Sequence, residues 1–112
     1  MNENTMMITI FISLGVLEII LGLPLMYKKI KPNNFYGFRM KKTLSNEKLW
    51  YETNKFMGRD FVLSGIALII VSLVLLIATE VDLIILTIIE TTIMAALIAT
   101  IMVRGEAFIR NF

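Results

Sequence analysis

The chain has no cysteine and no histidine, and it has only two prolines and one tryptophan among its 112 residues. Without cysteine it cannot form a disulfide, a thiolate zinc site or a thiol nucleophile, and without histidine it has no imidazole base. Walker loops, dinucleotide fingerprints and internal repeats are also missing. We therefore expect a protein that is not an enzyme and that has no metal and no cofactor.

Charge is scarce as well, with a formal net charge of only +2, whereas 57% of the residues are apolar. The mean hydropathy of +0.78 is too high for a soluble domain of this size to bury its apolar side chains. A membrane is the expected solvent. The cations lie between apolar runs, which favours a positive-inside loop and argues against a nucleic-acid partner.

Apolar runs long enough to cross a ~30 Å hydrocarbon core occur three times along the chain. We place the spans at about residues 6–27, 61–78 and 83–103, with Pro24 kinking or ending the first one. A very tight turn, Thr79 to Asp82, joins the last two. These spans predict an all-α, three-helix transmembrane bundle, with residues 1–112 forming a single membrane domain.

The orientation follows from the cations, because nine of them fall in the loop at residues 28–60. They are Lys28, Lys29, Lys31, Arg39, Lys41, Lys42, Lys48, Lys55 and Arg59. The positive-inside rule makes this loop cytoplasmic. With three crossings, the N-terminus lies outside and the C-terminus inside.

The second half of the loop has the pattern of a short amphipathic helix that begins after a cap at Ser45 or Asn46. Its apolar positions recur at helical spacing and are Leu49, Trp50, Thr53, Phe56 and Met57. One interpretation is an interfacial helix lying on the inner leaflet, with Trp50 and Tyr51 as headgroup anchors and Gly58 as a hinge into the second span. In the other, its apolar face caps the bundle or a partner.

The first half of the loop, Pro32 to Met40, combines turn residues with the aromatic rings of Phe35, Tyr36 and Phe38. These rings either anchor the segment at the interface, with Arg39 on lipid phosphate, or fold the loop into a plug for the end of the bundle.

Glu18 and Glu90 lie within apolar spans, where a charged side chain costs roughly 2.5 kcal/mol or more. Each glutamate is either protonated and hydrogen-bonded to a hydroxyl or carbonyl, or part of a proton or cation site. In a third interpretation, Arg39 folds inward and forms an ion pair with Glu18.

Small residues share faces with these acids, Gly15 and Gly22 in the first span and Thr91, Ala95 and Ala99 in the third. Such faces let helices approach closely. We expect them to support a homodimer, although the same faces can be satisfied within one protomer.

One set of loop residues resembles the signature of the SdpI family of small bacterial membrane immunity proteins. The set comprises Pro32-Asn33, Tyr36-Gly37-Phe38-Arg39, Thr43-Leu44, Trp50, Asn54 and Gly58-Arg59. Met40 departs from the family pattern, which often has a hydroxyl residue there, and larger members have more spans.

The resemblance implies a non-enzymatic protein of the bacterial cell membrane that protects against a membrane-active peptide toxin by binding it, with a signalling role as a further possibility. Its expected partners are membrane lipid, a peptide toxin, a cytoplasmic regulator and a second copy of the chain. The alternative is a small proton- or cation-coupled transporter that uses the two intramembrane glutamates. The candidate functional residues are Glu18, Asn33, Tyr36, Gly37, Arg39, Trp50, Asn54 and Glu90.

Overall fold

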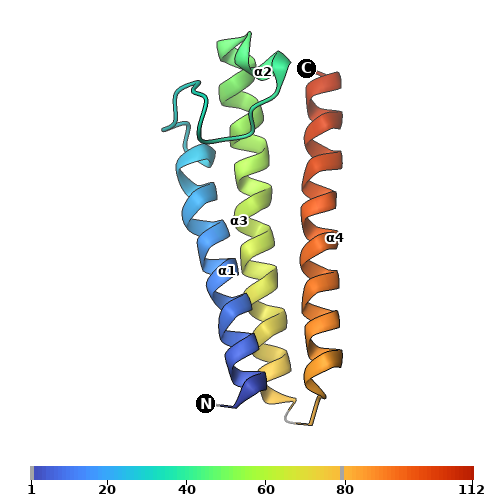
Figure 1. The fold of residues 1–112 in the computed structure, drawn as a ribbon. Helices are drawn as coiled ribbons and strands as arrows, with labels where there is room; N and C mark the ends of the chain where they lie inside the picture. Colours follow the sequence, from blue (N-terminus) through green and yellow to red (C-terminus); the bar gives the residue numbers. More distant parts are fainter. Residues whose placement is uncertain (1, 79) are drawn as a thin grey trace.

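Three long helices run side by side, and a short helix and an irregular segment lie across one end of them (Figure 1). The computed structural model describes residues 2–78 and 80–112, so Thr79 of the expected turn lies outside the described part. In chain order the helices are α1 (Glu3–Met26), α2 (Lys41–Leu44), α3 (Glu47–Ile77) and α4 (Leu83–Arg110). The described residues contain no strand.

The predicted three-helix membrane fold is confirmed, because α1, α3 and α4 are each long and apolar enough to cross a bilayer. The boundaries need one correction. The amphipathic segment of the loop is not a separate interfacial helix but the first half of α3, which runs for 31 residues without a break. At ~1.5 Å per residue α3 is about 46 Å long, so it extends well beyond a ~30 Å hydrocarbon core.

Helix α1 ends at Met26, two residues after Pro24. Lys28 then adopts a left-handed backbone conformation with φ 58°, and the Lys29 amide donates to the Pro24 carbonyl at 2.9 Å. A left-handed residue just after a helix allows the next amides to bond the last free carbonyls, which turns the chain sharply away.

The backbones of α1 and α3 touch at two pairs of glycines. A Cβ atom added to Gly15 would lie 2.8 Å from the Gly65 carbonyl oxygen, and one added to Gly22 would lie 2.8 Å from the Gly58 carbonyl oxygen. Only glycine fits at this separation. The close approach of the two helices increases their dispersion contacts, which matter because the hydrophobic effect does not drive helix association within lipid. Gly58 is therefore a packing residue inside a helix and not the hinge that we expected.

Helix α4 packs more loosely than α1 and α3 do, because only 17% of the residues in its most apolar stretch are buried. Gly105 lets Met57 of α3 pack directly against its backbone. The small-residue track of Thr91, Ala95 and Ala99 is exposed. The Gly15/Gly22 face is thus satisfied within one protomer, and a homodimer stays a prediction that only the α4 face supports.

Substituting Gly65 by alanine tests the glycine contact. The added methyl group has to push α1 and α3 apart, so we expect the free energy of unfolding to fall by about 1–3 kcal/mol, the usual cost of overpacking. Unfolding of the purified protein by SDS in mixed micelles, followed by circular dichroism, measures this. The control is Ala96→Leu on the exposed surface of α4, where we expect a change within about 0.5 kcal/mol. Equal stability of both variants with the unmodified protein would contradict the contact.

Candidate functional site

The segment between α1 and α3 folds back onto the first half of α3, and its polar side chains bond its own backbone. Asn33 is the centre of the first turn. Its Oδ1 atom accepts hydrogen bonds from the amides of Phe35 (2.8 Å) and Tyr36 (2.7 Å), while its Nδ2 atom donates to the Lys31 carbonyl at 2.7 Å. Asparagine is suited to this role because its short amide side chain mimics a backbone turn.

Tyr36 attaches this turn to α1. Its hydroxyl group donates to the carbonyl oxygen of Leu21, in the last turns of the helix. Burial of the ring edge raises the pKa of the Tyr36 phenol, so the group stays protonated and able to donate at physiological pH.

Gly37 lies against α3 with a φ of +112°, a conformation that favours glycine. A Cβ atom at this position would lie 3.0 Å from both Asn54 Oδ1 and Trp50 Cη2. Because Gly37 has no side chain, the backbone can come close to Asn54, and the amide of the next residue, Phe38, donates to Asn54 Oδ1 at 2.6 Å. Asn54 is 2% exposed, and its Nδ2 atom donates to the Trp50 carbonyl at 2.9 Å.

Trp50 is fully buried, and its Nε1 atom donates to the Ile30 carbonyl at 2.9 Å. The prediction that Trp50 anchors an interfacial helix in the headgroups is therefore wrong. The apolar face of this helical segment meets the chain itself, as in the alternative that the face caps the bundle. The local pattern could not distinguish the two, because lipid and protein are equally good apolar partners for one helix face.

The second half of the segment is held by Thr43 and Phe38. The buried Thr43 hydroxyl accepts from the Met40 amide at 2.8 Å and lies 2.9 Å from the Met40 carbonyl, which closes the start of α2. The Phe38 ring packs edge-on against Phe61 of α3, with ring centroids 6.1 Å apart. Met40 thus acts through its backbone, because both its amide and its carbonyl bond the Thr43 hydroxyl.

Arg39 does not meet Glu18, and the predicted ion pair is wrong. The Arg39 side chain is exposed and its Nη1 atom donates to the Asn34 carbonyl, while the described residues include no ion pair of Arg39. The tight turn at Asn33 keeps Arg39 on the outside of the folded segment. Glu18 instead faces α3, with its Cβ atom beside Gly65.

The two membrane acids lie in different helix interfaces. Glu18 is 5% exposed between α1 and α3, near the Ser64 hydroxyl, and Glu90 is fully buried between α4 and α3, where Ser72 Oγ lies 2.8 Å from its Oε1 atom. The Oε2 atom of each glutamate has no hydrogen-bond partner among the described residues. Ser64 and Ser72 are eight residues apart, about 12 Å along α3, so the acids do not form one site.

Sequence reasoning missed the ion pair that joins α3 to α4. Asp60 is 8% exposed, and its Oδ2 atom accepts from Arg104 Nε at 2.6 Å. The Arg104 guanidinium also lies over the Phe56 ring, which stacks on Phe108 with centroids 4.6 Å apart. A signal was present, since Asp60 lies three residues after Met57 and four before Ser64, which places it on their face of the helix.

A family model described as the SdpI/YfhL protein family matches residues 29–104, which include nearly all of the folded segment, α3 and most of α4. The chain belongs to this family. No curated protein and no solved structure matches it. SdpI/YfhL membership supports an immunity protein of the SdpI type in general. Together with the three candidate spans it supports a multi-pass membrane protein.

Replacing Asn54 by alanine tests the folded segment. The Phe38 amide and the Trp50 carbonyl would lose their buried partner, which typically costs about 1–3 kcal/mol. We expect the segment to open and its many lysines to become sensitive to trypsin, measured as the rate of cleavage in detergent. The matched control is Asn34→Ala, because the Asn34 side chain is exposed and only its backbone accepts a bond. Identical cleavage rates for the two variants would refute the arrangement.

Proposed function

We propose that this protein is an SdpI-type immunity protein that protects a bacterial cell by binding a membrane-active peptide toxin. The observation that supports this most is the way in which the family signature folds. Five signature residues hold the segment in its folded position, and they are Asn33, Tyr36, Gly37, Trp50 and Asn54. Residues that build a scaffold in this way pre-organise the side chains that remain free on it.

The free side chains include Phe35, which is 92% exposed, and the exposed Arg39. An exposed aromatic ring and a guanidinium group on a rigid turn are typical of recognition hot spots. Arg39 is the one cation of the signature that lies in the turn itself. We therefore assign Phe35 and Arg39, and not the buried signature residues, to direct contact with the partner.

The proposed orientation has the N-terminus outside and the folded segment in the cytoplasm, from the positive-inside rule. A secreted peptide would then reach the segment after inserting across the bilayer, and a cytoplasmic regulator would contact the same surface in a signalling role. Cysteines introduced at the exposed positions Asn46 and Glu80 should react with membrane-impermeant reagents from opposite sides. Labelling of the cysteine at position 46 from outside intact cells would show that the orientation is the opposite of the one proposed.

Arg39→Ala tests the function without disturbing the fold, because Arg39 bonds only a backbone carbonyl. A sensitive strain that expresses the unmodified protein should survive one member of a panel of membrane-active peptides, and the variant should lose this protection at an unchanged protein level in the membrane. The control is Lys41→Ala, an exposed cation of the neighbouring α2. The proposal fails if no peptide of the panel is resisted or if both variants protect fully.

A second candidate function is transport of protons or cations, and it draws on the unpaired Oε2 atoms of Glu18 and Glu90. Proteoliposomes with a pH-sensitive dye inside would report such flux. Loss of flux in both Glu18→Gln and Glu90→Gln would favour transport, whereas tight liposomes containing the unmodified protein would leave the immunity function alone in place.

A further inference from the structure

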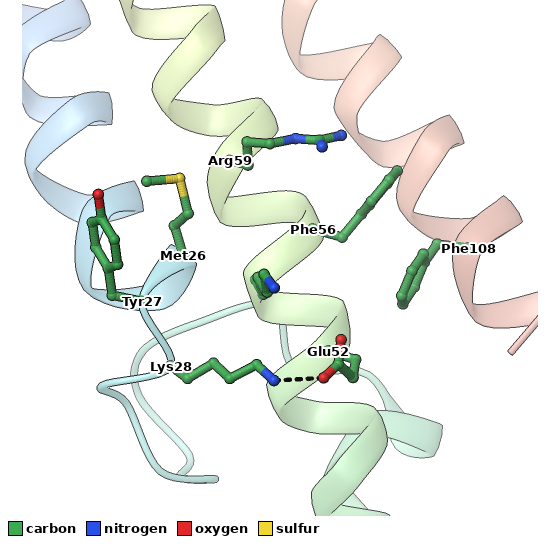
Figure 2. A pocket seen from close by; sticks show the side chains of 8 residues that line it. Met26, Tyr27, Lys28, Glu52, Phe56, Arg59 and Phe108 are labelled. Carbon is green, nitrogen blue, oxygen red and sulfur yellow. Dashed lines mark hydrogen bonds and ion pairs between the residues drawn. The ribbon is translucent and has the colours of Figure 1, made fainter.

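A cleft of about 670 Å³ opens beside the folded segment, where the ends of α1, α3 and α4 meet. Figure 2 shows its lining side chains, with Met26 at the end of α1, Tyr27 and Lys28 just after it, Phe108 from α4 and the remainder from α3. The α3 residues Glu52, Lys55, Phe56 and Arg59 follow each other at three- and four-residue spacing, so they line one face of that helix. The proposed immunity function does not use this cleft.

The charge of the cleft is positive. Lys28, Lys55 and Arg59 supply three positive charges and Glu52 one negative charge, which leaves a net charge of +2. Glu52 is already paired with Lys28. That pair ties the end of α1 to α3 across the cleft (Figure 2). Lys55 is left without an acid partner among the described residues. The Arg59 guanidinium lies over the Phe56 ring, and its one acid contact among these residues is at 3.7 Å from Asp60, which Arg104 bonds more closely.

Beyond the cleft, the face of α3 that carries Lys55 and Arg59 becomes apolar. On α3 the stripe beyond Arg59 consists of Leu63, Ile66 and Ile70, which are 55%, 42% and 56% exposed. Their spacing of four, seven and eleven residues from Arg59 keeps them on the same helix face. After Asp60 no charged residue follows in α3, so Arg59 lies where the helix passes from its polar to its apolar half.

We propose that this cleft is a binding site for one anionic phospholipid, with the phosphate group between Lys55 and Arg59 and the acyl chains along Leu63, Ile66 and Ile70. Arginine presents a planar fork that matches phosphate oxygens, and a nearby lysine adds a point charge. An acidic peptide would match the charge but not the apolar stripe that leads into the bilayer. Cations next to an apolar stripe complement an anionic headgroup and the acyl chains attached to it.

Native mass spectrometry of the purified full chain tests the site, with equimolar phosphatidylglycerol and phosphatidylcholine that carry the same acyl chains. We expect one phosphatidylglycerol molecule to be retained per protomer in preference to phosphatidylcholine. Lys55→Gln and Arg59→Gln should each lower this preference about fivefold, the effect expected for one cation near an anionic headgroup. Lys29→Gln and Lys31→Gln remove exposed cations outside the cleft and should leave it unchanged.

Helical content from circular dichroism shows whether a variant is folded. A second measurement needs no variant, because added salt should weaken the preference of the unmodified protein for phosphatidylglycerol. Equal retention of both lipids, equal loss of preference in cleft and control variants, or no effect of salt would overturn the proposal. Displacement by excess soluble glycerol phosphate would show a site for a free anion. Retention of an acidic amphipathic peptide without retention of phosphatidylglycerol would assign the cleft to a protein partner.

Discussion

The close contact between the backbones of α1 and α3 is the constraint on which the other interactions depend. The glycine pairs Gly15/Gly65 and Gly22/Gly58 set how near the two helices come, and no side chain larger than hydrogen fits at any of these positions. At this separation the carbonyl group of Leu21 comes within reach of Tyr36, and the carbonyl group of Ile30 comes within reach of Trp50. If the helices were farther apart, the folded segment could not be attached to α1 through Tyr36 and to α3 through Trp50 at the same time.

The folded segment solves a problem of backbone hydrogen bonding. Residues 27–40 form neither helix nor strand, yet several of them, including Asn33 and residues 36–38, are partly buried. A covered backbone group needs a partner, and here side chains supply it. Asn33 serves the first turn, Asn54 the passage past Gly37, and Thr43 the entry into α2. Amides, an indole and a hydroxyl do this without charge, which suits a site at the edge of a low-dielectric membrane.

Hydropathy was sufficient to predict the three spanning helices, because apolar runs of this length are typical of helices that cross a membrane. The same pattern could not show what covers the apolar face of residues 47–57, and the structure covers it with the chain itself through Trp50. For Arg39 and Glu18, opposite charge alone suggested a pair, but the Asn33 turn directs Arg39 outward and the glycine contact directs Glu18 toward α3. Asp60 was missed because its partner, Arg104, lies 44 residues further along the chain.

The signature residues fold the segment onto α3 and do not insert it into the headgroups. The protein has a single tryptophan, so its ¹⁵N spectrum contains one indole N–H signal, that of Trp50. Hydrogen exchange at this group in nanodiscs tests this directly, because the Nε1 proton is buried and donates to Ile30. We expect exchange far slower than that of free tryptophan and a chemical shift that is the same in zwitterionic and anionic nanodiscs. Rapid exchange, or a shift that follows the lipid headgroup, would contradict it.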